Sequence, residues 1–219
     1  MRGDVIRQSS PRTNDLERSV ELLRQVASGD GPERVLRLYT PAPTLALTRR
    51  ESLMPGCQTA VSAAERLGFA PAIRPTGGRA VAYDETCLVF DLVEREEAHA
   101  DPTAFFAQTG RTIVDALRGL GVDARLGEVP GEYCPGEYSI NARGAVKLVG
   151  TSQRGVRGAR LLSGMLAFGP VDRFVAVLTE ANAALGLDWD PQTFGSMLTE
   201  APAVSRDDVE NALAAALIA

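Results

Sequence analysis

Apolar residues recur every three or four positions in four stretches of the chain, which is the spacing of an amphipathic helix. The first stretch follows a capping-box pattern that begins at Asn14, and Gly29 ends it. Another opens with Asp101 and Pro102, a favourable helix start, and closes at Gly121. Together with a shorter segment that ends before a glycine, these stretches predict helices over residues 14–28, 58–67, 101–121, 172–185 and 205–217.

Shorter runs of β-favouring residues, separated by glycine and proline, predict the strands. Residues 34–48 fit two short strands joined across a turn that contains Pro41 and Pro43. The glycine turn at residues 76–78 lies between two further runs, so we expect strands over residues 69–73 and 87–93.

Residues 138–169 have the pattern of a β-meander, with turns at residues 143–144 and 157–158. Its strands are expected over residues 138–141, 145–153 and 159–168. Because strands come in runs with helices between them, without strict alternation, the pattern favours an α+β fold with mixed or antiparallel sheets and packed helices. The length is ordinary for one domain, and we expect a single domain over residues 1–219.

Composition narrows the function classes. The net charge of -5 and the pI of about 5.1 argue against nucleic-acid binding, which normally requires a basic surface. The longest uncharged apolar runs, such as residues 87–90 and 164–168, are far shorter than a membrane-spanning helix. The first residues lack the apolar stretch of a secretory signal, so we expect a cytoplasmic protein with free thiols.

Lys147 is the only lysine among 23 lysine and arginine residues. Its neighbours on both sides of the expected strand are apolar, so its side chain should be partly desolvated. A desolvated amine either finds an anionic or carbonyl partner or has a lowered pKa, and either outcome suits a catalytic group. The alternative is an exposed lysine that snorkels from an edge strand.

Cys134 lies in the turn-forming stretch Tyr-Cys-Pro-Gly-Glu-Tyr, where a side chain can be exposed beside a rigid sheet. A thiol becomes a good nucleophile when a cation stabilises its thiolate, and Lys147 is the cation that an adjacent strand can supply. The alternative is a buried cysteine that acts as a small hydrophobe. That alternative fits Cys87 and Cys57 better, and the only histidine, His99, lies in an acidic stretch away from the cysteines.

No spacing of histidine, cysteine or carboxylates fits a metal site, so we expect no metal. The turn Thr76-Gly77-Gly78-Arg79-Ala80 can present backbone N–H groups at a point of close approach, to a carbonyl, a phosphate or an extended chain. A glycine pair alone is also common in ordinary turns, and neither a P-loop nor a dinucleotide-binding pattern is present.

Two segments, Arg-Pro-Thr-Gly-Gly-Arg-Ala-Val-Ala-Tyr-Asp at residues 74–84 and Lys-Leu-Val-Gly-Thr-Ser-Gln-Arg at residues 147–154, resemble motifs of the lipoate ligase, octanoyltransferase and biotin ligase superfamily. Residues 133–140 followed by Lys147 are most similar to bacterial acyltransferases that move octanoyl groups onto lipoyl domains through a cysteine thioester. The resemblance implies a biotin/lipoate ligase-like catalytic domain of α+β class.

The resemblance also implies roles for individual residues. Cys134 would be the nucleophile and Lys147 would reach the acyl carbonyl. The acyl group would lie against Arg74, Thr76, Gly77, Gly78, Arg79, Ala80, Gly150, Thr151, Ser152 and Gln153.

Three departures from the superfamily pattern bear on the reaction. Tyr83 replaces the histidine that often precedes the aspartate, and Arg79 stands where ATP-using ligases commonly have another glycine. Both argue against adenylation. The accessory domain of many ligases is also expected to be absent, because the chain ends soon after the last predicted helix.

The leading hypothesis is therefore transfer of an octanoyl or lipoyl group to the lysine of a lipoyl domain through a Cys134 thioester, with no cofactor. The implied partners are lipoyl domains of 2-oxoacid dehydrogenases, the glycine-cleavage H protein or acyl carrier protein. The alternatives are an ATP-dependent lipoate-protein ligase and a non-catalytic carrier-binding homologue. Arg143, Arg154, Arg157 and Arg160 lie around the same predicted hairpins, and we propose that they steer an acidic carrier toward the pocket. The alternative is that they are scattered surface charges.

Overall fold

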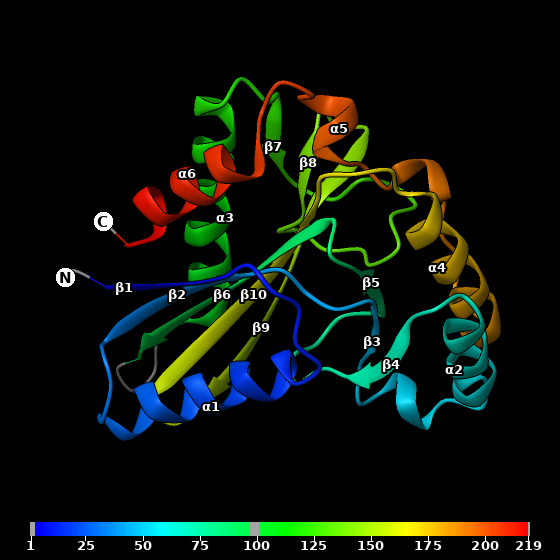
Figure 1. Ribbon diagram of the computed structural model, residues 1–219, viewed down its shortest axis with the longest axis horizontal. Coiled ribbons are helices and arrows are strands. Elements are labelled where there is room, and N and C mark those ends of the chain that lie inside the picture. Colours follow the sequence, from blue (N-terminus) through cyan, green and yellow to red (C-terminus); the bar gives the residue numbers. More distant parts are fainter. Residues whose placement is uncertain (1–2, 97–100, 219) are drawn as a thin grey trace.

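The computed structural model describes residues 3–96 and 101–218, and it contains a larger and a smaller β-sheet with helices packed against them (Figure 1). The larger sheet has seven strands in the described part of the chain. In spatial order they are β1 (Asp4–Gln8), β2 (Arg34–Tyr39), β6 (Cys87–Arg95), β10 (Ala159–Ala167), β9 (Val146–Val156), β8 (Ile140–Ala142) and β7 (Ala124–Leu126). Among these strands β1 and β2 are parallel neighbours, and the other neighbours are antiparallel.

The smaller sheet carries the glycine turn between two of its strands. Its order is β4 (Ala70–Ile73), β3 (Thr44–Leu47) and β5 (Val81–Tyr83), with β3 parallel to β4 and antiparallel to β5. The two strands expected in residues 34–48 are confirmed, and the segment with Pro41 and Pro43 takes the chain from the larger sheet to the smaller one.

Five helices confirm the helical pattern: α1 (Asp15–Ser28), α2 (Cys57–Arg66), α3 (Pro102–Gly119), α4 (Asp172–Leu185) and α6 (Arg206–Ile218). Asp101 caps α3 by accepting a hydrogen bond from the Thr103 N–H. The predicted side-chain cap at Asn14 is wrong, because Asn14 makes no such bond.

The elements that the sequence pattern missed are short. A run of three to five residues holds too few positions to display a periodicity. They comprise β1, β5, β7, the 3₁₀ helices η1 (Glu51–Leu53) and η2 (Pro191–Thr193), and α5 (Met197–Glu200).

The β-meander is confirmed, since β8, β9 and β10 are successive antiparallel neighbours. Arg143 and Gly144 both have positive φ, 59° and 72°, in the tight turn between β8 and β9. The first strand begins at Ile140 and not at Tyr138, because the Ser139 N–H bonds back to the Gly136 carbonyl and keeps the preceding residues in a turn.

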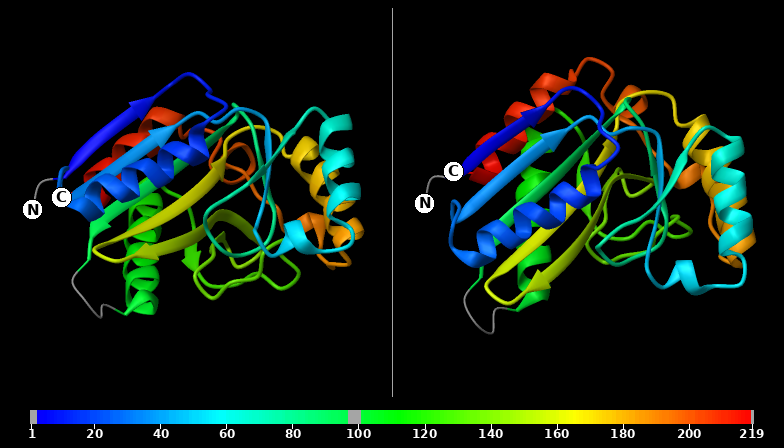
Figure 2. Two further views of the ribbon diagram at one scale, coloured as in Figure 1. Left: turned by 90° about the horizontal axis from the view of Figure 1, so that it is seen from below. Right: turned by 60° about the horizontal axis from the view of Figure 1, so that its bottom comes forward.

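The two faces of the larger sheet pack against different helices (Figure 2). On β6, Leu88, Phe90 and Leu92 point into a core shared with α3 and α6. The alternate residue Val93 packs with Leu23 of α1 on the opposite face. Alternation of side chains across a strand produces this division.

A third core joins the smaller sheet, α2 and α4 to the end of the larger sheet. Tyr39, Val89 and Met165 of the larger sheet contribute to it, beside Phe174 of α4. The segments that carry the candidate residues meet where the two sheets approach each other. The expected α+β class with mixed sheets is confirmed, whereas the extent of a single domain over residues 1–219 stays a prediction.

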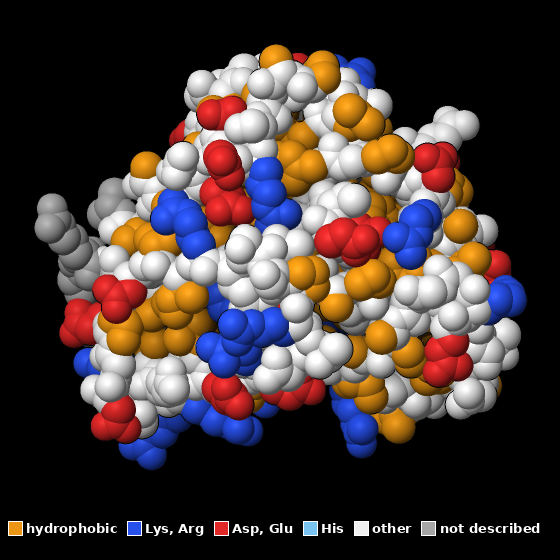
Figure 3. Space-filling model, viewed as in Figure 1, with side chains coloured by type: hydrophobic (Ala, Val, Ile, Leu, Met, Phe, Trp, Pro, Cys, Tyr) orange, Lys and Arg blue, Asp and Glu red, His pale blue; other side chains and the backbone are white. Residues whose placement is uncertain are grey.

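The outer surface mixes both signs of charge. On the face shown in Figure 3, Lys and Arg side chains lie among Asp and Glu side chains. Glu210, for example, forms ion pairs with both Arg7 and Arg206. Within residues 3–96 and 101–218, no helix has the length and hydropathy that crossing a membrane requires.

Candidate active site

An irregular loop at residues 127–139, between β7 and β8, is organised around the carboxylate of Glu132, which is fully buried. One of its oxygens accepts from the Ser139 hydroxyl at 2.6 Å, and the other accepts from the Val129 N–H at 3.2 Å. Gly131, with φ of 87°, provides the left-handed turn just before it. The loop therefore fixes the backbone of the residues that follow, Tyr133 and Cys134.

Lys147 of β9 is 4% exposed, and it donates hydrogen bonds to two acceptors of this loop. Its Nζ donates to Glu132 Oε1 at 3.1 Å and to the backbone carbonyl of Cys134 at 2.6 Å. The same Nζ lies 4.7 Å from the ring centroid of Tyr133. The expectation that a desolvated lysine finds an anionic or carbonyl partner is confirmed, and it has found both.

Gly150 makes room for this arrangement. A Cβ at this position would lie 2.7 Å from the Tyr133 hydroxyl and 3.2 Å from Lys147 Cε. Both distances are shorter than ordinary carbon contacts, so a side chain here would displace the lysine or the tyrosine. The packing of Lys147 and Tyr133 therefore requires a glycine at position 150.

The glycine turn contacts the thiol of Cys134 directly. The Cys134 Sγ accepts a hydrogen bond from the Arg79 N–H at 3.2 Å. Gly78 has φ of 99°, and a Cβ on it would lie 3.0 Å from Sγ and 2.7 Å from the Arg74 guanidinium. A backbone N–H aimed at sulfur stabilises negative charge there, as a nucleophilic thiolate requires.

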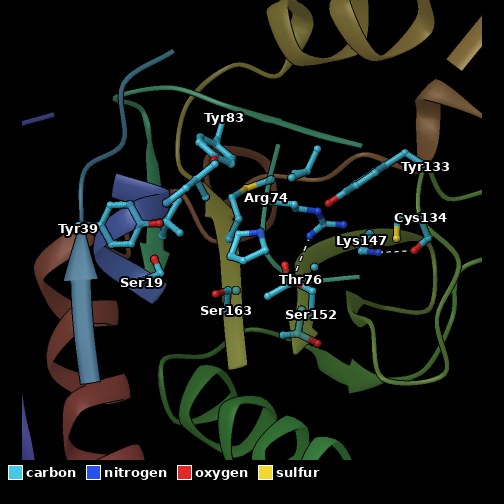
Figure 4. A pocket seen from close by; sticks show the side chains of 18 residues that line it. Ser19, Tyr39, Arg74, Thr76, Tyr83, Tyr133, Cys134, Lys147, Ser152 and Ser163 are labelled. Carbon is cyan, nitrogen blue, oxygen red and sulfur yellow. Dashed lines mark hydrogen bonds between the residues drawn. The ribbon is translucent and has the colours of Figure 1, made fainter. Parts of the chain in front are cut away.

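Arg74 joins the two motifs (Figure 4). Its guanidinium donates to the Ser152 hydroxyl at 3.0 Å and to the Arg79 carbonyl at 2.5 Å. Ser152 in turn donates to the Thr76 hydroxyl at 2.8 Å. The Arg74 Nε is buried and has no hydrogen-bond partner in the described part of the chain.

Two cavities meet at the thiol. The inner one is narrow, about 50 Å³, and the outer one has about 330 Å³. The residues that line both are Cys134, Lys147, Thr151 and Ser152. The remaining predicted residues divide between them, with Arg74, Thr76 and Gly150 on the inner cavity and Gly77, Gly78 and Gln153 on the outer one.

Arg79 and Ala80 support the site without lining either cavity. The Arg79 N–H reaches the thiol, as described above. The Ala80 N–H donates to buried Glu51 at 2.8 Å, and the other Glu51 oxygen accepts from Thr48. The buried Glu51 carboxylate therefore fixes the end of the glycine turn at Ala80.

The walls of the inner cavity are mainly apolar and aromatic, and include Val81, Val89 and Met165. Figure 4 shows Tyr39 and Ser19 on one side of this cavity and Tyr133 and Cys134 on the other. Burial raises the pKa of both phenols well above the ordinary value, so they stay neutral. The mainly apolar walls suit an alkyl chain, and Arg74 and Lys147 are the charged residues of the lining.

A second buried charge cluster lies behind the far side of the inner cavity. Asp91 accepts from the hydroxyls of Ser19 and Ser163, both at 2.6 Å, and from Arg37 at 3.3 Å. Arg37 also pairs with Asp15. Burial raises the pKa of Asp91, although Arg37 and the two serines act in the opposite direction.

The other thiols have different surroundings. Cys87 is fully buried, and burial raises the pKa of its thiol to about 12. Cys57 is half-buried at the first position of α2. His99 lies outside the described residues, and residues 3–96 and 101–218 hold no group of three or more His, Cys, Asp or Glu side chains placed to bind a metal.

The prediction of one arginine cluster is wrong for Arg143, whereas Arg154, Arg157 and Arg160 lie together on the β9–β10 hairpin. Arg143 and Arg157 lie in turns at opposite ends of β9, whose 11 residues rise about 3.3 Å each, so roughly 30 Å separates them. Arg143 pairs with Glu200, and Arg160 pairs with Glu94. Arg154 donates to the Pro75 carbonyl and so touches the glycine turn.

Sequence reasoning missed two side chains of the site, Glu132 and Tyr133. Both directly precede Cys134, so the signal was present in the segment already singled out. A solitary lysine between apolar neighbours requires a counter-ion, and the carboxylate nearest to the cysteine was the available candidate.

Similarity to known proteins agrees with this geometry. A family model described as the lipoyl protein ligase A/B catalytic domain matches residues 13–218. The chain belongs to the lipoyl protein ligase A/B catalytic domain family. A curated relative, the octanoyl-[GcvH]:protein N-octanoyltransferase of an Exiguobacterium species, is 30% identical over 124 residues, which are 57% of this chain and 44% of that protein. The matched part is therefore less than half of the relative's length.

Solved structures of the same family have the same fold. A lipoate-protein ligase A with bound ATP has a TM-score of 0.77 and 25% identity, and the alignment covers 97% of this chain and 83% of that one. A lipoate protein ligase from Thermoplasma acidophilum with bound lipoic acid has a TM-score of 0.75, with the same identity and coverage. The family thus includes proteins described as transferases and proteins described as ligases.

Proposed function

We propose that this protein transfers an octanoyl or lipoyl group from a carrier protein to the lysine of a lipoyl domain through a thioester on Cys134. One observation carries the proposal: the Cys134 thiol lies where a narrow apolar cavity meets a wider one, with a backbone N–H on its sulfur. The relative described as an octanoyl-[GcvH]:protein N-octanoyltransferase supports the same reaction class.

In the first step the Cys134 thiolate attacks the acyl carbonyl carbon of the carrier-bound group. The bond from that carbon to the carrier breaks, a C–S bond forms, and the carrier's leaving atom takes up the proton that the thiol released. In the second step the amine of the acceptor lysine attacks the thioester and restores the thiol. The alkyl chain occupies the inner cavity during both steps.

Lys147 polarises the acyl oxygen. An ammonium has three N–H donors, and two are given to Glu132 and to the Cys134 carbonyl. The remaining donor is available to an acyl oxygen as negative charge develops on it, in a site from which most water is excluded. Because the lysine also holds the Cys134 backbone, the oxygen donor and the nucleophile move as one unit.

Mass spectrometry tests the thioester directly. The protein is incubated with an octanoylated carrier, quenched in acid and measured intact. The expected result is one octanoyl adduct that hydroxylamine removes, and that Cys134→Ser does not form as a thioester. Cys57→Ser, at another partly exposed thiol, is the matched control and keeps the adduct. An adduct on Cys57 or on Lys147 would contradict the proposal.

The second candidate is ATP-dependent ligation of free lipoate or octanoate. The structural similarity to ligases that bind ATP and lipoic acid favours it. In that case Lys147 contacts the acyl adenylate and Cys134 is incidental. Full activity of Cys134→Ala with free octanoate and ATP, together with no transfer by the wild type from an octanoylated carrier, would establish the ligase and exclude the transferase.

The proposal includes the cellular setting. The transferase needs no cofactor, its donor is the glycine-cleavage H protein or acyl carrier protein, and it acts in the cytoplasm, where its three thiols stay reduced. Assays with each octanoylated carrier, with and without ATP, identify the donor. Binding of a lipoyl domain without acylation by any donor would indicate a non-catalytic homologue.

A further inference from the structure

The outer cavity is a second way to the thiol. It shares Cys134, Lys147, Thr151 and Ser152 with the inner cavity, and its other lining residues are different. An alkyl chain in the inner cavity places the thioester carbonyl at this junction. A nucleophile that attacks the thioester must then arrive through the outer cavity.

The outer cavity carries a negative charge at its opening. Among the described lining residues, Glu137 and Lys147 are the charged side chains. Lys147 is neutralised by the buried Glu132, whereas Glu137 is exposed. The exposed carboxylate of Glu137 is therefore placed to attract a cation to this cavity.

Aromatic rings form part of the same wall. Phe106 of α3 and Tyr138 of the cysteine loop stack with centroids 5.5 Å apart and planes within 7°. Both line the outer cavity, next to Glu137. Aromatic faces and a carboxylate together recognise an ammonium group on an aliphatic stem, because the rings pack against the methylenes and attract the charge.

The lining of the outer cavity also includes Gly77, which has no side chain. A Cβ built on Gly77 meets no atom within 4 Å, and Gly77 has no positive φ. The position therefore borders open space and accepts a side chain without backbone strain. A larger residue at Gly77 would narrow the cavity while leaving the fold unchanged.

We propose that the outer cavity, between Gly77 and the wall formed by Phe106, Glu137 and Tyr138, is the port through which the acceptor protein inserts its lysine side chain toward Cys134. The inference rests on the proposed function and adds the binding site of the second substrate. Glu137 attracts the ammonium at the opening, and the stem of the lysine lies along the rings.

The chemistry inside the port balances. The ammonium loses one proton to solvent, and the free amine attacks the thioester carbonyl carbon. A C–N bond forms, the C–S bond breaks, and the second amine proton restores the Cys134 thiol. The products are an amide on the acceptor and the free enzyme.

Separating the two half-reactions tests the port. Cys134 is loaded with S-octanoyl-N-acetylcysteamine, a small donor that presents no protein lysine, and a lipoyl domain is then added. We expect Glu137→Lys to slow transfer from the loaded enzyme about tenfold more than it slows loading. The control Glu21→Lys makes the same charge change at an exposed position of α1 and keeps both rates.

Equal transfer rates for Glu137→Lys and Glu21→Lys would overturn the port. A second variant, Gly77→Val, should block transfer to the lipoyl domain more strongly than it affects loading. If Gly77→Val instead slows both half-reactions equally, the cavity does not serve the acceptor in particular and the inference fails. Absence of any octanoyl thioester on the wild-type protein would contradict the proposed function itself, which is a different result.

Discussion

Two buried charge clusters lie near opposite sides of the inner cavity, and only one of them has a charged side chain that lines it. Lys147 and Glu132 lie beside the thiol, and Lys147 lines both cavities. Arg37 and Asp91 lie behind the far side, and neither lines the inner cavity. Burial of charge is common to both, so burial alone does not identify a reactive site.

The two clusters differ in whether their cationic side chain lines a cavity, since Lys147 does and Arg37 does not. Lys147 gives two of its three donors to the protein, and its side chain lines both cavities. Arg37 is bound by Asp15, Asp91 and a neighbouring glutamine, and its guanidinium stacks 3.9 Å from the Tyr39 ring centroid. The first cluster suits polarisation of a ligand, and the second holds α1 against the sheet.

The largest expected effect is on catalysis at the first cluster. Lys147→Met removes the donor to the acyl oxygen and should lower the rate of octanoyl transfer by about 10² to 10³, as for loss of an oxyanion donor. The measurement is the transfer rate per folded molecule, with folding monitored by circular dichroism.

A double variant separates charge burial from catalysis in that cluster. Lys147→Met leaves Glu132 buried without its cation, which lowers stability as well. Adding Glu132→Gln should recover most of the stability and none of the rate. Recovery of the transfer rate in the double variant would contradict a direct role of Lys147.

At the second cluster the expected effect is on stability. Asp91→Ala leaves two serine hydroxyls and part of Arg37 without their acceptor, and should lower the free energy of unfolding by about 3 kcal/mol. Urea denaturation measures it, and the transfer rate per folded molecule should stay close to that of the wild type. A loss of rate with unchanged stability would instead indicate that the second cluster takes part in catalysis.

A smaller effect is expected at the turn that touches the thiol. Gly78→Ala places a methyl group 3.0 Å from Cys134 Sγ in a left-handed backbone conformation, at a cost of about 1 to 2 kcal/mol. Alkylation of Cys134 by iodoacetamide should be slower than in the matched variant Gly77→Ala, which meets open space. Equal alkylation rates would show that the turn does not constrain the sulfur.

The smallest expected effect is the pH dependence of the second cluster. Burial raises the pKa of Asp91 above its value in the unfolded chain, so the folded state holds the proton more tightly. The stabilisation from this proton is present at low pH and is lost as pH rises from about 4 through the raised pKa. The stability of the wild type relative to Asp91→Asn should therefore fall as pH rises above about 4 in urea titrations, and a rise would contradict it.

Hydrophobic periodicity was sufficient for the long elements. The helix that ends at Leu185 and the two long strands of the meander, β9 and β10, were predicted because each is long enough to repeat its pattern and is followed closely by a glycine. The short strand Val81–Tyr83 was missed, because its pairing partner is 34 or more residues earlier in the chain.

The candidate residues for the chemistry could be selected from the amino-acid sequence. A single lysine in an apolar strand, a cysteine in a rigid turn and a glycine pair in a third segment are visible without coordinates, because each is an exception to its local pattern. Tertiary structure decided how they combine. It assigned Glu132 and the Cys134 carbonyl to Lys147, and the Arg79 N–H to the sulfur. These contacts join segments that are 13 to 55 residues apart, and only the packing of the two sheets fixes such distances.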